Sequence, residues 1–93
     1  MKENQYFTVQ FNLFNYLSSE AALLYSYLVN VEATVFDRRE DYFKLSNSFI
    51  QKIFKDWSKY KIRTLLNELV DKEFIKLSSF NEDGNNYRYI KII

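Results

Sequence analysis

Apolar and polar residues alternate at the start of the chain. Single polar residues separate the apolar side chains of Phe7, Val9, Phe11 and Leu13. This twofold period is typical of a strand with one buried face, because successive side chains of a strand point to opposite sides. We therefore expect an N-terminal strand or extended arm within residues 1–16.

The spacing then changes to that of an α-helix. Apolar residues recur three or four positions apart, at Leu24, Tyr27, Leu28 and Val31. Ser18 or Ser19 can cap the first turn, in which Glu20 lies at the positive end of the helix dipole. The pattern predicts a first helix that runs to about Glu32.

A second helix is predicted after Ser46. Leu45 precedes this serine and Ile50 lies in the first turn after it, which is the spacing of a hydrophobic staple around a capping serine. The helix should end near Lys55. Its expected buried face consists of Phe49, Ile50, Ile53 and Phe54.

Ser58 repeats this arrangement with Trp57 before it and Ile62 after it, so a third helix should follow. Its apolar residues have the spacing of one continuous stripe, so they should face the core. They are Ile62, Leu65, Leu66, Leu69 and Val70.

Strand patterns occupy the remaining segments. Residues 33–41 read as a polar loop, and residues 42–45 as a short strand. Beyond Lys72 the period returns to two, and residues 80–86 form a loop with the only glycine of the chain between two strands. We expect one α+β domain over residues 1–93, with a helical core at 17–72 and a hairpin at 73–93.

The amino-acid composition excludes several kinds of functional site. The 93 residues include no cysteine and no histidine, which excludes disulfides, thiolate chemistry, the usual zinc ligands and the commonest general base. Asp37, Glu40 and Asp41 cluster without a phosphate-binding loop or metal-ligand spacing, so we read them as a charged loop. We expect no catalytic residue, no metal and no cofactor. Without an 18-residue apolar run, we expect a soluble cytoplasmic protein.

Positive charge is concentrated in one segment. Residues 1–43 contain three basic and six acidic residues, and residues 64–93 contain four and five. Residues 44–63 contain six basic residues against Asp56 alone, although the whole chain has a net charge of only +1. Such a segment is often no more than a solvated face, but it also suits a polyanionic ligand.

The order of elements and three motifs resemble the winged helix-turn-helix family. The motifs are LSSEAALLYSYL, FKLSNSFIQKIF followed by DWS, and KIRTLLNELVDKEFIKL with the final hairpin. They look most like domains of RepA-type replication initiators of plasmids and mobile elements, and secondly like DnaD-like replication proteins. These families usually have glycine where this chain has Glu73. Their wings are often basic, whereas this hairpin carries Glu82 and Asp83.

The resemblance implies that the third helix binds DNA. Its outward face and first turns would then meet base edges through Tyr60, Lys61, Thr64 and Asn67. Phosphates would be held by Lys44, Lys52, Lys55, Lys59 and Arg63. From the hairpin, Arg88 and Asn85 or Asn86 could touch the DNA backbone.

Aromatic residues leave a second function open. Those near the two ends exceed what a small core can bury: Tyr6, Phe7, Phe11, Phe14, Tyr16, Tyr87 and Tyr89. We expect them to pack a homodimer or another protein, with a stacking platform for single-stranded nucleic acid as the alternative. The first hypothesis is thus a double-stranded DNA binder in replication initiation or regulation of a mobile element. The second is an adaptor for a primase, polymerase or helicase.

Overall fold

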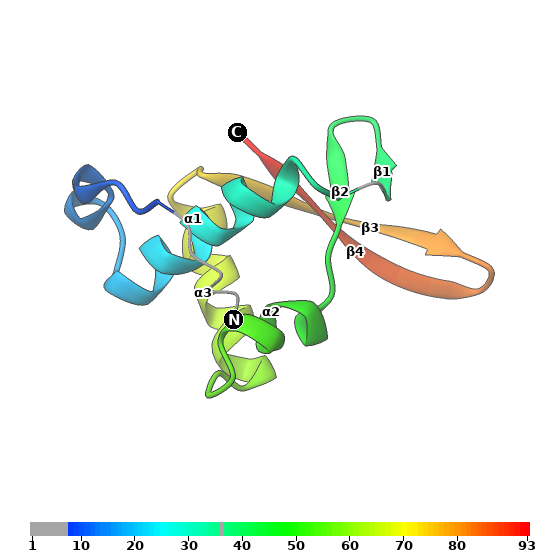
Figure 1. Cartoon of the computed structure of the whole chain (residues 1–93). Coiled ribbons are helices and arrows are strands. Elements are labelled where there is room, and N and C mark those ends of the chain that lie inside the picture. The colour runs from blue at the N-terminus through cyan, green and yellow to red at the C-terminus, as the bar shows by residue number, and fades with distance from the viewer. Residues whose placement is uncertain (1–7, 36) are drawn as a thin grey trace, which may run out of the picture.

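The computed structural model describes residues 8–35 and 37–93. These residues form three α-helices, a 3-10 helix and a four-stranded antiparallel sheet with the strand order β1-β2-β4-β3 (Figure 1). The elements are η1 (Phe11–Asn15), α1 (Ser19–Glu32), β1 (Arg38–Arg39), β2 (Tyr42–Lys44), α2 (Asn47–Ile53), α3 (Lys59–Asp71), β3 (Ile75–Glu82) and β4 (Asn85–Ile92). In this part of the chain no helix is long and apolar enough to cross a membrane.

Capping serines set the starts of the α-helices, as the sequence predicts. The hydroxyl of Ser18, Ser46 or Ser58 accepts a hydrogen bond from the backbone N–H three residues later, over 3.2, 3.3 and 3.0 Å respectively. Each bond satisfies a donor that has no partner within its own helix. The predicted helix starts are therefore confirmed, with Ser18 and not Ser19 capping α1.

The core lies between the helices and one face of the sheet. The α3 stripe is confirmed, because Ile62, Leu65, Leu66 and Leu69 are buried and Val70 is partly buried against them. The stripe packs with apolar residues of α1 and with fully buried side chains of the sheet. The largest of these from the sheet are Phe43, Ile75 and Ile90.

The expected N-terminal strand or extended arm is wrong over residues 11–15, whereas residues 8–10 have no regular structure, Gln10 is extended, and Phe7 lies outside the described residues. Phe11–Asn15 instead form η1, at which the N–H of Leu13 donates to the Gln10 carbonyl and the N–H of Tyr16 donates to the Leu13 carbonyl. Leu13 packs against the core, whereas Phe11 is 88% exposed. No described strand pairs with this segment, so local helical hydrogen bonds satisfy its backbone.

Residues 33–41 are not entirely a loop. Arg38 and Arg39 form β1, which pairs with β2 through the partners Arg38↔Phe43 and Arg39↔Tyr42. No apolar alternation predicts this strand, because β1 is only two residues long and both residues are exposed. Glu40 has a φ of 56°, which lets the chain reverse between the two strands.

The C-terminal hairpin is confirmed, but its loop is shorter than residues 80–86. β3 and β4 each contain eight residues, and only Asp83 and Gly84 separate them. Both have positive φ, at 53° and 87°, as a type I′ turn requires. The side chain of Asn81 supports the turn by accepting the N–H of Gly84 over 3.2 Å.

Glu73 ends α3 in the left-handed region, with a φ of 65°. The N–H of Phe74 donates to Leu69 over 2.9 Å, and the N–H of Glu73 donates to Val70 over 3.0 Å. These two bonds are those of a Schellman motif, in which Glu73 takes the position usually held by glycine. Glutamate in place of glycine at position 73 thus occurs where the backbone adopts a conformation that favours glycine.

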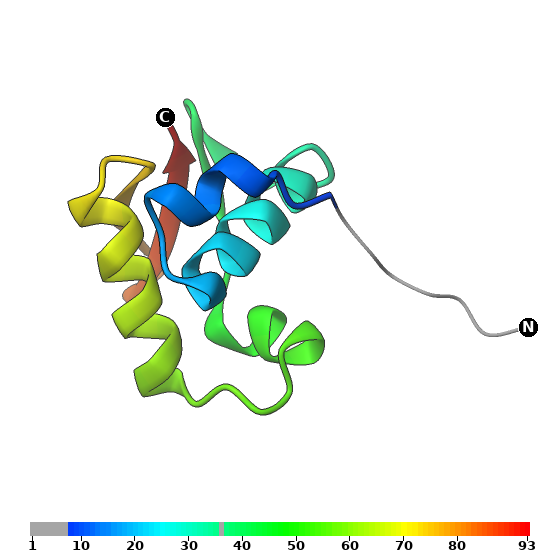
Figure 2. The same ribbon diagram turned by 90° about the vertical axis from the view of Figure 1, so that its left-hand side faces the viewer.

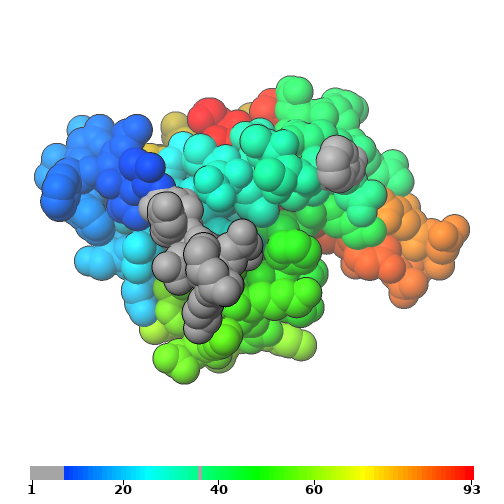
Figure 3. Space-filling model, viewed as in Figure 1, coloured from blue at the N-terminus to red at the C-terminus, as the bar shows by residue number. Residues whose placement is uncertain are grey.

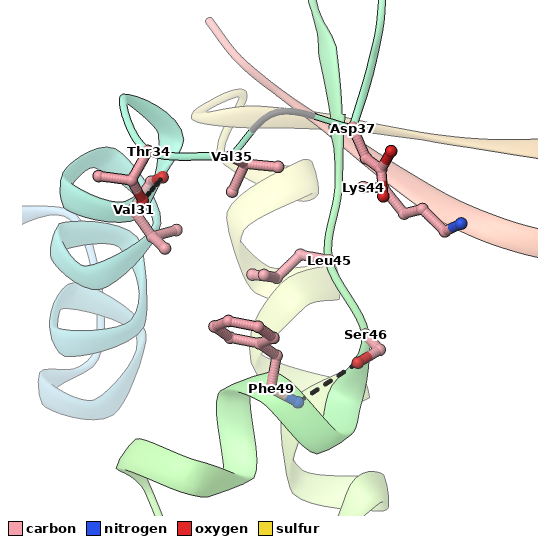
Figure 4. Close-up of a pocket in the computed structure, with 8 residues that line it drawn as sticks. All are labelled: Val31, Thr34, Val35, Asp37, Lys44, Leu45, Ser46 and Phe49. Carbon is pink, nitrogen blue, oxygen red and sulfur yellow. Dashed lines mark hydrogen bonds between the residues drawn. The ribbon is translucent and has the colours of Figure 1, made fainter.

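Phe49 is not part of the core, contrary to expectation. α2 ends at Ile53 and not near Lys55, and of its predicted face Ile50 is buried while Ile53 and Phe54 are partly buried. Phe49 is 48% exposed and lines an open groove of about 460 Å³ with residues of α1 and β2 (Figure 4). Successive side chains of an α-helix are rotated by about 100°. Because Ile50 points into the core, Phe49 lies at the edge of the buried face of α2.

Candidate nucleic-acid interface

The outward face of α3 carries the residues that the sequence placed there. Tyr60 is 77% exposed, and Arg63, Thr64 and Asn67 are also exposed. They lie on the side of α3 opposite its buried stripe, and Figure 2 shows the helix along one side of the molecule, with α1 beside it. The Thr64 hydroxyl donates to the Tyr60 carbonyl over 3.0 Å, which fixes this side chain against its own helix.

Four cations accompany this face: Lys52 from α2, Lys55 from the turn, and Lys59 and Arg63 from α3. All four are exposed, and none forms an ion pair with a described residue. The Lys52 ammonium lies 5.2 Å from the centre of the Phe49 ring. This cation–π contact does not neutralise the positive charge of Lys52. The turn and the helix after it therefore present positive charge that described acidic side chains do not neutralise.

Lys61 differs from these cations. Its ammonium is 2.7 Å from the carboxylate of Glu20 in the first turn of α1, and both side chains are about two-fifths exposed, at 42% and 44%. On the same flank of α3, Glu68 accepts hydrogen bonds from the N–H and the hydroxyl of Ser18, each over 2.8 Å. This flank of α3 contacts α1 and its capping residue, and the Lys61 ammonium is held in that contact.

Lys44 also has partners within the chain. Its ammonium lies 2.9 Å from Glu82 and 3.9 Å from the centre of the Tyr87 ring. Glu82 accepts a hydrogen bond from the Tyr89 hydroxyl as well, and this bond, followed by that from Lys44, lowers the pKa of Glu82 to about 2. Since Arg39 is 3.5 Å from the same carboxylate, this acidic residue of the hairpin is neutralised by its neighbours.

Arg88 does not project from the hairpin. Its guanidinium donates to the Asn47 side chain over 2.6 Å and to the Leu45 carbonyl over 2.9 Å, at the start of α2. Burial lowers the pKa of Arg88. The other hairpin candidates, Asn85 and Asn86, are exposed. Because side chains alternate along a strand, Arg88 lies on the same sheet face as Ile90. The sequence could therefore have predicted that Arg88 points toward the helices.

The aromatic side chains separate into two groups. On the sheet face away from the helices, Tyr89 is 2% exposed and packs edge-on against Phe80 at 4.9 Å. Its burial removes it from the predicted stacking platform. Phe11, Phe14 and Tyr16 around η1 remain exposed, and Figure 3 shows that segment at the end of the molecule opposite the hairpin. Tyr6 and Phe7 lie outside the described residues.

Comparisons with known proteins add no assignment. No protein-family model matches this chain, and no curated protein or solved structure matches it either.

Proposed function

We propose that this chain is a winged-helix protein that binds double-stranded DNA through α3. The order of elements supports the proposal: β2 lies between α1 and α2 in sequence, it pairs with β4, and the hairpin follows α3. This is the arrangement that the resemblance to winged helix-turn-helix proteins implies. The same resemblance supports a role in replication initiation or regulation of a plasmid or mobile element.

The exposed basic surface of the helix-turn-helix segment carries the proposal. Lys59 and Arg63 occupy the first turns of α3, and Lys52 and Lys55 precede them. These side chains would contact phosphates, which fixes the position of the protein without reading sequence. Tyr60, Thr64 and Asn67 would meet base edges. Lys61 would join them after releasing Glu20, while the charge of Lys44 is already paired with Glu82.

A matched pair of variants tests this surface. The double substitution Lys59→Gln and Arg63→Gln removes two exposed positive charges from α3. The double substitution Lys72→Gln and Lys76→Gln removes two exposed positive charges elsewhere. Fluorescence anisotropy on a labelled duplex should be recorded at several salt concentrations for both proteins and for the wild type.

We expect the variant with Lys59→Gln and Arg63→Gln to bind the duplex about tenfold or more weakly than the wild type. Its affinity should also fall less steeply with salt, by the amount expected for the loss of about one to two phosphate contacts. The second should stay within about threefold of the wild type, because long-range attraction is screened at physiological salt. Equal losses in the two variants would contradict the proposed surface. So would a wild-type affinity that does not change with salt.

Exposed aromatics favour one second function, an adaptor for a replication enzyme. Phe11, Phe14 and Tyr16 are 88%, 42% and 61% exposed, which is unusual for side chains without a binding role. Purified primase, polymerase or helicase from the same mobile element should then bind the chain. Replacing Phe11 and Tyr16 by serine should abolish this association and leave duplex affinity unchanged. Retained association in the serine variant would reject the adaptor.

A further inference from the structure

A hollow beside the half of β4 that lies next to the hairpin turn contains a cation without a counter-ion. The hollow has a volume of about 240 Å³ and lies between the start of α2 and strand β4. Its lining residues are Lys44, Leu45, Ser46, Asn47, Asn86, Tyr87 and Arg88. No acidic side chain is among them.

Arg88 supplies the charge in this hollow. Its two hydrogen-bond acceptors, the Asn47 amide oxygen and the Leu45 carbonyl, are neutral. None of the ion pairs among the described residues includes it. Its Nε–H is shielded from solvent and has no described acceptor. A largely buried guanidinium in these surroundings is costly, and an anion beside it would offset that cost.

The two side-chain amides beside Arg88 have their oxygens occupied and their N–H₂ groups free to donate. The Asn47 oxygen accepts from Arg88, so its amide N–H₂ remains as a donor. In the same way, the Asn86 oxygen accepts from Asn81 over 3.2 Å and leaves its own N–H₂. The Ser46 hydroxyl accepts the N–H of Phe49 and lies 3.4 Å from the Ser48 hydroxyl, and either of these two hydroxyls can be the donor. The Lys44 ammonium is paired with Glu82, so it is not one of the free donors of the hollow.

We infer that this hollow binds the oxyanion of a phosphate group. A planar guanidinium with neutral amide and hydroxyl donors around it matches the several acceptor oxygens of phosphate. The phosphate is either a diester of a DNA backbone or a free phosphate. Only the DNA source rests on the proposed function, because the donor set is a property of the hollow itself.

An isosteric substitution tests the site without removing Arg88. Asn86→Asp places a carboxylate in the hollow, where it becomes the counter-ion of Arg88, and it keeps the oxygen that accepts from Asn81. The matched control is Asn85→Asp, which adds the same charge to the adjacent exposed residue of β4. That residue does not line the hollow.

The first measurement is an NMR titration of ¹⁵N-labelled protein with sodium phosphate, and with sodium chloride at equal ionic strength. We expect phosphate, but not chloride, to shift the Arg88 Nε–H signal with saturation. Asn86→Asp should weaken phosphate binding about tenfold or more, and Asn85→Asp should change it by about twofold or less. Identical responses to the two salts, or equal effects of the two variants, would overturn the inference.

The second measurement is duplex affinity of the same two variants, which separates the two sources of phosphate. A tenfold lower affinity of Asn86→Asp relative to Asn85→Asp, about 1.4 kcal/mol, assigns the site to the DNA backbone. Equal duplex affinities, together with the NMR result, assign it to free phosphate. If replacing Lys59 and Arg63 leaves DNA binding intact, the proposed function is rejected. The phosphate titration still shows, independently of that result, whether the hollow binds phosphate.

Discussion

Replacing Glu73 by glycine should stabilise the protein. Glu73 holds a φ of 65° in the Schellman motif that ends α3. A side chain with a Cβ atom is strained in this region, whereas glycine adopts it freely. The Glu73 carboxylate also stands at the negative end of the helix dipole, where an anion is unfavourable.

The expected gain is the balance of three contributions. Removing the left-handed strain contributes about 1–2 kcal/mol. The greater freedom of glycine in the unfolded chain costs about 0.4–1 kcal/mol. Removing the carboxylate from the end of the dipole adds about 0.3 kcal/mol, because the side chain is exposed. The free energy of unfolding should therefore rise by about 1 kcal/mol.

Thermal and urea denaturation followed by circular dichroism will measure this change. For a domain of this length the melting temperature should rise by about 4–8 °C. Glu73→Gln is the control, because it removes the charge but keeps the Cβ atom, so it should recover only the small dipole contribution. A destabilised glycine variant would refute the reasoning. Equal gains in the two variants would attribute the whole effect to charge.

Two further predictions concern ion pairs. Glu82 has a folded-state pKa of about 2, lowered by Tyr89 and then by Lys44, so its contribution to stability is present above its ordinary pKa and is lost as the pH falls toward 2. Urea unfolding of Glu82→Gln between pH 6 and pH 2 should show a flatter profile than the wild type, and parallel profiles would contradict this. Glu20→Gln should free Lys61 and raise duplex affinity about threefold to tenfold, while stability falls by about 1 kcal/mol or less. Unchanged anisotropy titrations would remove Lys61 from the interface.

The helical part of the fold could be predicted because its determinants are local. Ser18, Ser46 and Ser58 each act on an N–H three residues away, and the α3 stripe repeats within a single helix. The same periodicity identified the outward face of α3, including Tyr60 and Asn67. For these elements the sequence contains the structural information within a few residues.

The remainder depends on partners distant in the sequence. The alternation in residues 7–13 would form a strand only beside another strand, and none of the described strands pairs with it. Lys44 meets Glu82 across 38 residues, and Arg88 meets Asn47 across 41. A count of charges along the chain treats Lys44 as free and Glu82 as an acidic wing residue, although each largely neutralises the other.

The burial of Tyr89 has a consequence for the shape of the molecule. Strand β4 packs against the helices through Ile90, and on the other sheet face Phe80 packs against Tyr89 within the hairpin and against Tyr42 of β2. Bending the hairpin away from the rest of the domain would separate Ile90 from the helices and Phe80 from Tyr42 at the same time, so these contacts oppose such a movement. A long ligand that contacted both α3 and the hairpin would have to fit the fixed angle between them, so discrimination between straight and curved ligands would come from the rigidity of the protein and not from adaptation of a loop.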